Sequence, residues 1–169
     1  LTKDMLMYQG SSSDQPVRVT STDIPAIVDV NHDGDLDILT FDIFGTVLME
    51  YYENLSLELY GNKDSLYFEK RDQCWGKFME SFTTNSVDTG ISCKFKNGFK
   101  AEAHAGSTLM AYDADNDLDI DLLLGDVGFN EMKLLTNGGD TSFAYITVQD
   151  TPFPSYNVPI NIESFPAAF

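Results

Sequence analysis

The same order of apolar and polar positions occurs twice along the chain. Each copy has a short apolar run (residues 24–28 or 108–112), then an acidic segment, then a second apolar run that ends at Asp42 or Asp126. Short apolar runs bounded by polar turns are typical of β-strands. The pattern therefore predicts an all-β protein that contains a repeated unit of strands.

The register of the two copies also agrees beyond the acidic segments. A third apolar run follows in each copy and ends at Asn54 or Asn137. Asn54 lies 17 residues after Asp37, the last acid of the first segment, and Asn137 lies 16 residues after Asp121. Two unrelated stretches would not keep this spacing, so it favours two copies of one hairpin-containing unit.

Both acidic segments place an oxygen-bearing side chain at every second position. The ten positions are Asp29, Asn31, Asp33, Asp35 and Asp37 in the first acidic loop and Asp113, Asp115, Asp117, Asp119 and Asp121 in the second. Carboxylates packed this closely repel one another unless a cation lies among them. A hard divalent ion prefers oxygen ligands, so the spacing predicts two calcium sites.

The spacing gives each loop position a role. Side chains at positions 1, 3 and 5, the backbone carbonyl at position 7 (Asp35 or Asp119), and a carboxylate at position 9 are expected to converge on the ion. Gly34, at position 6 of the first loop, supplies the positive φ of the turn. Leu118 holds that position in the second loop, where a bulky residue at positive φ is an outlier. We therefore expect the second turn to be built differently or strained, and its site to be weaker or more selective.

The acidic loops have two other interpretations. An EF-hand loop begins with the same pattern but needs a bidentate acid at position 12 and a helix on each side. Position 12 is Thr40 in the first loop and Leu124 in the second, and β-like runs follow both loops. The sequence therefore argues against an EF-hand. In the other interpretation the acids only solvate an exposed turn and bind no ion.

Composition narrows the class of protein. The chain has 169 residues, is 43% hydrophobic, and is long enough to bury the core of one domain. Its net charge is −17, which disfavours nucleic acid and anionic membranes as partners. No apolar run is long enough to insert in a membrane as a helix. The chain opens at Leu1 without a signal peptide, so we expect a processed or partial product.

Cys74 and Cys93 are the only cysteines. They form no C-x-x-C motif and no clustered histidines accompany them, which argues against a zinc site. In a calcium-rich extracellular setting we expect a disulfide, and two unpaired buried thiols are the alternative. The disulfide would contribute about 3 kcal/mol in the chain-entropy model.

These motifs resemble a known family of repeats. The pattern D-x-[DN]-x-D-[G]-D-[LI]-D-[IL], most specific at residues 23–42 and 107–126, is similar to the FG-GAP/VCBS repeats of integrin-α-type β-propellers. Similarity to large secreted, surface-displayed propeller proteins of Bacteroidetes is carried by residues 74–78, 104–107, 135–139 and 165–169. The resemblance implies four-stranded antiparallel blades with loop-bound calcium, an extracellular or cell-surface location, and a role in adhesion or scaffolding.

The repeat divides the chain into four parts. Residues 1–22 are expected to end a preceding blade, residues 23–106 to form a blade with the first calcium loop, residues 107–164 to form a blade with the second, and residues 165–169 to start the next blade. The first blade carries an insertion at about residues 61–104. Two blades cannot close a ring, so we expect this partial propeller to belong to a longer polypeptide or to be completed by other chains.

The insertion contains both cysteines and the only tryptophan. It also contains a basic patch formed by Lys94, Lys96 and Lys100. Residues 73–82 are expected to form one short helix. Trp75 and Phe78 either cover the outer face of the blade or form, with the disulfide, an exposed binding surface.

No catalytic arrangement is recognisable. His32 and His104 are the only histidines, and Ser107 is near His104 only in sequence. No pair of carboxylates is singled out for glycoside hydrolysis, and no Gly-rich phosphate loop opens a helix. We therefore expect a non-catalytic, calcium-binding propeller segment that acts in adhesion, assembly or binding of a glycan or protein ligand. The alternative is the substrate-binding accessory propeller of a larger extracellular polysaccharide-degrading enzyme.

Overall fold

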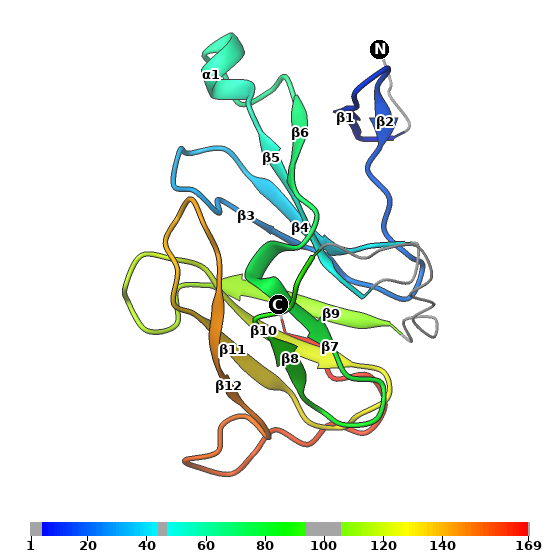
Figure 1. Ribbon diagram of the computed structural model, residues 1–169, viewed down its shortest axis with the longest axis vertical. Helices are drawn as coiled ribbons and strands as arrows, with labels where there is room; N and C mark the ends of the chain where they lie inside the picture. The colour runs from blue at the N-terminus through cyan, green and yellow to red at the C-terminus, as the bar shows by residue number, and fades with distance from the viewer. Residues whose placement is uncertain (1–4, 44–46, 94–105, 169) are drawn as a thin grey trace.

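The computed structural model describes residues 5–43, 47–93 and 106–168. Its elements, in chain order, are β1 (Met7–Gln9), β2 (Gln15–Pro16), β3 (Ala26–Val28), β4 (Asp37–Phe41), β5 (Met49–Asn54), α1 (Ser56–Tyr60), β6 (Phe68–Asp72), the 3-10 turn η1 (Trp75–Lys77), β7 (Phe78–Glu80), β8 (Val87–Thr89), β9 (Ser107–Tyr112), β10 (Asp121–Asp126), β11 (Lys133–Asn137) and β12 (Ile146–Asp150). The described residues form an all-β protein with several antiparallel sheets, none of which closes into a barrel or a propeller (Figure 1).

The first sheet contains β3, β4, β5 and β6, and the β1–β2 hairpin extends it beyond β6. Tyr8 of β1 pairs in parallel with Phe68 of β6. All five residues of β4 are buried, which explains why this strand has a continuous apolar run rather than an alternating one. The sequence assigned residues 1–22 to a preceding blade, and in the structure their two strands belong to the same sheet as β3–β6.

The second sheet contains β9, β10, β11 and β12, paired in the order in which they occur along the chain. The strands β3–β6 of the first sheet are paired in the same sequential order. The two sheets meet where β3 and β9 lie side by side. There the Ile24 N–H donates to the Ser107 carbonyl at 2.9 Å, and the Leu109 N–H donates to the Ile24 carbonyl at 3.0 Å.

One hydrophobic core joins the two sheets. It includes Leu39, Phe41 and Met49 from the first sheet and Leu122, Leu124, Leu135 and Ile146 from the second. Trp75 and Phe78 lie in the same core, and the Phe78 ring contacts the Phe41 ring edge-to-face at 6.4 Å between centroids. Because they are only 4% and 0% exposed, Trp75 and Phe78 pack inside the molecule and form no exposed binding surface.

The segment expected to be an insertion is organised differently. β6 falls inside residues 61–104, yet it pairs antiparallel with β5 as a strand of the first sheet, with a register shift between Tyr51 and Tyr52. The prediction of a short helix at residues 73–82 was wrong, because this segment forms η1 and β7. Gly76 has a φ of 74° within η1, which is incompatible with a continuing α-helix. The basic patch of the insertion lies outside the described residues.

The β7–β8 hairpin packs against the second sheet, in front of it in Figure 1. The Gln149 side chain of β12 accepts from the Val87 N–H and donates to the Val87 carbonyl, each at 3.0 Å. The backbone N–H and carbonyl of Val87, on an edge strand, are thus paired with a side-chain amide instead of with a neighbouring strand. The hairpin thereby becomes part of the same core as the two sheets.

A buried ion pair also connects the hairpin to the second sheet. Lys133 Nζ lies 3.3 Å from Glu80 Oε1, and the two side chains are 0% and 3% exposed. Ser107 Oγ donates to Glu80 Oε2 at 3.0 Å. Buried charges persist only when they are paired, so this contact holds β7, β9 and β11 together. The sequence raised Ser107 as a neighbour of His104, which lies outside the described residues.

The last described residues lie beside β9 and β10. The Thr108 hydroxyl donates to the Pro166 carbonyl at 2.8 Å. Gly125 is required here, because a Cβ at this position would lie 2.0 Å from the Pro166 oxygen. The equivalent position of the first sheet is Phe41, whose side chain is buried in the core. The repeated units therefore use this position in two different ways.

Candidate metal centre

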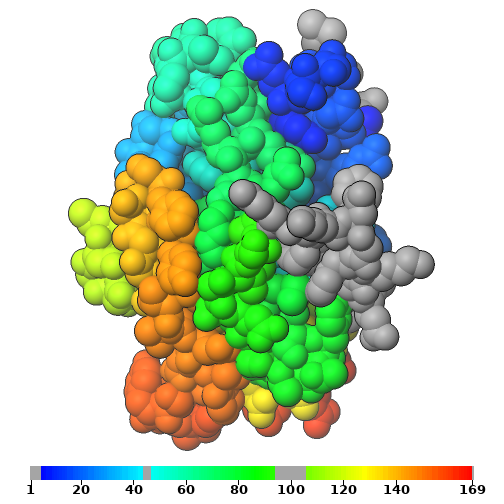
Figure 2. Space-filling model, in the orientation of Figure 1, coloured from blue at the N-terminus to red at the C-terminus, as the bar shows by residue number. Residues whose placement is uncertain are grey.

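Each acidic loop connects two neighbouring antiparallel strands. The first loop joins β3 to β4 and the second joins β9 to β10. The β-hairpin setting expected from the sequence is present in both, and strands rather than EF-hand helices flank the loops. The loops lie on the same side of the molecule, at the left of Figure 1, and the second projects at the left edge of Figure 2.

Four backbone hydrogen bonds to carboxylates recur at equivalent positions of the two loops. In the first loop Val30 and Asn54 donate to Asp37, Gly34 to Asp29, and Asp35 to Asp33, at 2.9, 2.8, 2.9 and 2.9 Å. In the second loop Ala114 and Asn137 donate to Asp121, Leu118 to Asp113, and Asp119 to Asp117, at 2.8, 2.8, 3.2 and 3.0 Å. The two loops therefore share one folded frame.

The acid at position 9 ties each loop to the third strand of its sheet. Asp37 and Asp121 are both 0% exposed. Each accepts one backbone bond from within its loop and one from Asn54 or Asn137. This contact explains why the asparagines follow the last acid at nearly the same spacing in the two copies. A carboxylate has about four acceptor positions, so the bonds leave room for a cation as well.

The turn at position 6 has the same hand in both loops. Gly34 has a φ of 99° and Leu118 a φ of 76°. His32 and Asn116, at position 4, likewise have φ values of 63° and 66°. Of the two expectations for the second loop, the strained turn is the one observed, because a leucine adopts a backbone region that favours glycine.

Three carboxylates of the second loop lie close enough to share an ion. Asp113, Asp115 and Asp117 each present an oxygen within 4.8 Å of the other two. Calcium–oxygen distances of about 2.4 Å place two ligands on opposite sides of one ion at nearly that separation. Asp119 is 3% exposed, and neither of its carboxylate oxygens has a hydrogen-bond partner among the described residues. A buried carboxylate in this state stays charged only beside a positive partner.

The first loop also contains buried carboxylate oxygens that lack a hydrogen-bond partner. They are Asp29 Oδ1, Asp33 Oδ2 and Asp35 Oδ1. Asp29 and Asp33 are the residues at positions 1 and 5, where the sequence predicts ligands. Buried carboxylate oxygens that accept no hydrogen bond are costly, so their shared location supports a cation-binding loop.

Asn31 and Asp35 connect the first loop to its surroundings. Asn31 Oδ1 accepts from the Asp33 N–H at 3.1 Å, and Asn31 Nδ2 donates to Glu53 Oε1 at 2.8 Å. Asp35 Oδ2 accepts from the Leu57 N–H of α1 at 2.7 Å. The sequence assigned only a backbone carbonyl to Asp35, and its side-chain contact was missed because α1 was not predicted.

Burial changes the acidity of several loop residues. Desolvation raises the pKa of Asp37 to about 7, although its bonds to Asn54 and Val30 oppose the shift. Desolvation, together with the charges of Asp117 and Asp121, raises the pKa of Asp119 to about 6. The pKa of Asp121 is raised as well, again chiefly by desolvation. A bound cation would remove this penalty by favouring the charged carboxylates.

The two loops are in direct contact. His32 Nε2 lies 2.8 Å from the Leu118 carbonyl oxygen, which makes a hydrogen bond between position 4 of one loop and position 6 of the other. The sequence gave no signal for this contact, because His32 is at a non-ligand position and 86 residues separate the partners. The loops therefore form one acidic surface instead of two isolated sites.

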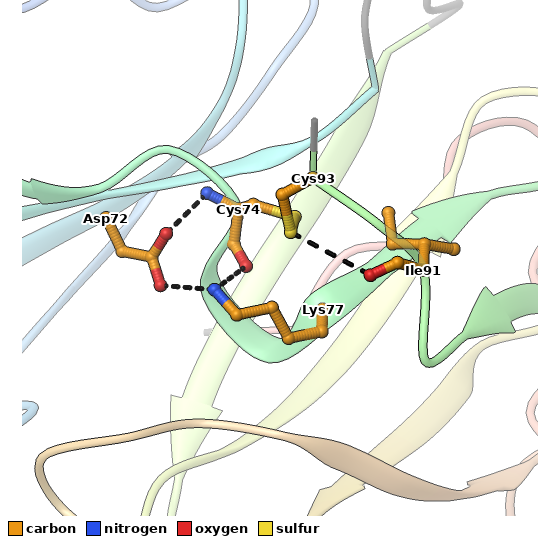
Figure 3. The surroundings of a disulfide bond; sticks show 5 residues. All are labelled: Asp72, Cys74, Lys77, Ile91 and Cys93. Carbon is orange, nitrogen blue, oxygen red and sulfur yellow. Dashed lines mark hydrogen bonds and ion pairs between the residues drawn. A yellow bond between two sulfur atoms is a disulfide. The ribbon is translucent and has the colours of Figure 1, made fainter. Parts of the chain in front are cut away.

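The expected disulfide joins Cys74 to Cys93, with the Cα atoms 5.9 Å apart. Figure 3 shows its surroundings. Asp72 accepts from the Cys74 N–H and from Lys77 Nζ, each at 2.8 Å. Lys77 Nζ also donates to the Cys74 carbonyl at 3.0 Å. These contacts and the disulfide fix η1 between the two sheets, and the bond is consistent with an extracellular protein.

Comparison of the chain with models of protein families, with curated proteins and with solved structures gives no match. Within the described part of the chain, no helix is both long and apolar enough to cross a membrane. The chemistry of the two loops is therefore the basis for assigning a function.

Proposed function

We propose that this chain is a non-catalytic, calcium-binding segment of a secreted or cell-surface protein, in which the metal stabilises the fold. The observation that carries the proposal is the group of buried, unpartnered carboxylate oxygens in both acidic loops. Calcium fits this donor set because it takes six to eight oxygen ligands in flexible geometry, whereas magnesium demands a near-ideal octahedron.

We further propose that β3–β6 and β9–β12 are two blades of a β-propeller. Three observations support this arrangement: the strands of both sheets pair in sequential order, the two acidic loops share the same backbone hydrogen bonds, and β3 contacts β9. In this proposal other strands, from the same polypeptide or from another chain, cover the exposed edges of the sheets. The segment would then act in adhesion, assembly or ligand binding.

Calcium titration of chelator-treated protein tests the metal sites. The unmodified protein is expected to bind two calcium ions, as measured by calorimetry. The variant with Asp113→Asn, Asp115→Asn and Asp117→Asn removes the three clustered carboxylates and is expected to bind one. A variant with Asp14→Asn, Asp64→Asn and Asp88→Asn changes three exposed acids outside the loops and is expected to keep both sites. Absence of binding heat in the unmodified protein contradicts the proposal.

A further inference from the structure

A polar cleft of about 390 Å³ lies beside the first acidic loop. Its walls come from the first loop, from β5 and β6, from η1, and from the turn between β11 and β12. The cleft is thus formed by segments far apart in sequence that the common core brings together. Its volume falls within the usual range of small-molecule sites, toward the lower end.

One wall of the cleft is a fixed hydrogen-bonded network. Glu53 accepts from Asn31 Nδ2 at 2.8 Å and pairs with the Arg71 guanidinium. Arg71 also pairs with Glu69 at 2.9 Å. The Arg71 side chain is 45% exposed and that of Glu53 is 15% exposed. Both groups are therefore held in place by protein partners and yet reachable from the cleft, which lowers the entropic cost of binding a ligand.

The turn between β11 and β12 supplies hydroxyl groups to the cleft. Thr141 and Ser142 lie in the β11–β12 turn and line the cleft. Among the described residues their hydroxyls make no hydrogen bond within the protein, and neither does the indole N–H of Trp75. The cleft therefore offers donors and acceptors that its own network does not use.

The charges of the cleft define the class of ligand. Its lining includes three carboxylates and one guanidinium, that of Arg71. Arg71 is already paired with Glu53, which lines the cleft, and with Glu69 of β6. Anionic ligands are repelled by this balance, on a protein whose net charge is −17. Aromatic stacking is also limited, because Trp75 is only 4% exposed. A neutral ligand that exchanges many hydrogen bonds fits best.

We infer that this cleft binds one or two units of a neutral saccharide. Sugar hydroxyls both donate and accept, and so match a wall of carboxylate, guanidinium, amide and hydroxyl groups. Charge-assisted bonds to Glu53 and Arg71 supply the stronger contacts.

The cleft and the first acidic loop share Asn31. Its amide oxygen faces the loop through the bond from the Asp33 N–H, and its amide nitrogen holds Glu53 in the cleft wall. A cation that fixes Asn31 would therefore also fix Glu53. This part of the inference rests on the proposed calcium site, and it makes saccharide binding weaker when calcium is removed.

Saturation-transfer NMR of the calcium-loaded protein tests the inference, with D-glucose, D-galactose, D-mannose, N-acetyl-D-glucosamine and L-fucose as probes. At least one probe is expected to bind. The variant with Thr141→Ala and Ser142→Ala is expected to bind it about 30-fold more weakly, because it loses two hydrogen bonds that each contribute about fivefold to the affinity. The control with Ser11→Ala and Ser12→Ala, two exposed serines outside the cleft, is expected to bind it unchanged.

The outcomes separate this inference from the proposed function. If calcium binds but no probe does, or if the Thr141 and Ser142 variant binds as tightly as the control, the cleft assignment is overturned while the metal sites stand. If a probe binds equally well in EDTA and in calcium, the link through Asn31 is overturned. A loss of at least several-fold in EDTA supports it.

Discussion

Leu118 occupies in the second loop the left-handed conformation that Gly34 occupies in the first. The side chain is 67% exposed, so packing does not compensate for the strained backbone. A residue other than glycine in this region costs about 1–2 kcal/mol. The strain is maintained by the bonds of the Asp113 carboxylate to the N–H groups of residues 116–118.

Leu118→Gly should therefore improve the second loop. Relief of strain outweighs the added backbone entropy of glycine, for a net gain of about 0.5–1 kcal/mol in the free energy of unfolding. Calcium affinity of the weaker site should rise as well. The matched change Gly34→Ala imposes strain at a φ of 99° and should reduce stability. Denaturant unfolding and calcium titration of both variants measure these effects. A loss of calcium affinity in Leu118→Gly would show that Leu118 does not weaken the second site.

Acidity of the loop residues predicts how calcium binding depends on pH. In the calcium-free protein the pKa of Asp37 is about 7 and that of Asp119 about 6. The ion binds the charged carboxylates, so protons compete with it below these pKa values. Calcium affinity of the first loop should fall by nearly tenfold per pH unit below pH 7, and that of the second loop should also fall on acidification, because the pKa values of Asp119 and Asp121 are raised. Acids with ordinary pKa values would leave both affinities level between pH 7 and 5.5, which titration calorimetry would detect.

At the scale of elements, short contacts between polar groups position the strands. Asp37 and Asp121 connect each hairpin to its third strand, while Glu80 and Lys133 connect the β7–β8 hairpin to the second sheet. These groups are buried, and an unpaired buried charge is far more costly than an exposed one. The architecture therefore depends on a small number of buried polar groups that have partners, as well as on the apolar core.

Lys133→Met tests the buried ion pair. It removes the ammonium that pairs with Glu80 in the core, and we expect a loss of about 3–5 kcal/mol in the free energy of unfolding. Adding Glu80→Gln should restore part of this loss, because the amide carries no charge. Lys77→Met is the control, since its pair with Asp72 is more exposed, at 20% and 35%, and should contribute about 1 kcal/mol or less. Equal losses in the two lysine variants would show that burial of the pair is unimportant.

Across the whole molecule, the sequence predicted those features that depend on local patterns of residues. The strands around both acidic loops, the hairpin setting and the disulfide were confirmed, because apolar runs, turn residues and ligand spacing are local signals. The contacts made by Trp75, His32 and the β7–β8 hairpin were missed, because they depend on how segments far apart in sequence pack together. The helix expected near Trp75 was wrong, since Gly76 and the packing of Phe78 override the helical pattern.

The central claim is that calcium in the acidic loops stabilises the whole fold. The two loops hold nine carboxylates on a chain of net charge −17. Bound calcium offsets the repulsion among these carboxylates in the folded state, and the ion has little affinity for the unfolded chain. At a calcium concentration 100 times the dissociation constant, each site adds about 2.7 kcal/mol to the free energy of unfolding.

Thermal unfolding in excess calcium and in EDTA, followed by circular dichroism, tests this claim most directly. Two loaded sites predict that EDTA lowers the midpoint by roughly 10 °C or more, given a shift of about 2–4 °C per kcal/mol at this chain length. Magnesium should restore little of the loss, because its octahedral geometry fits the loops poorly. An identical midpoint in calcium and in EDTA would contradict the account.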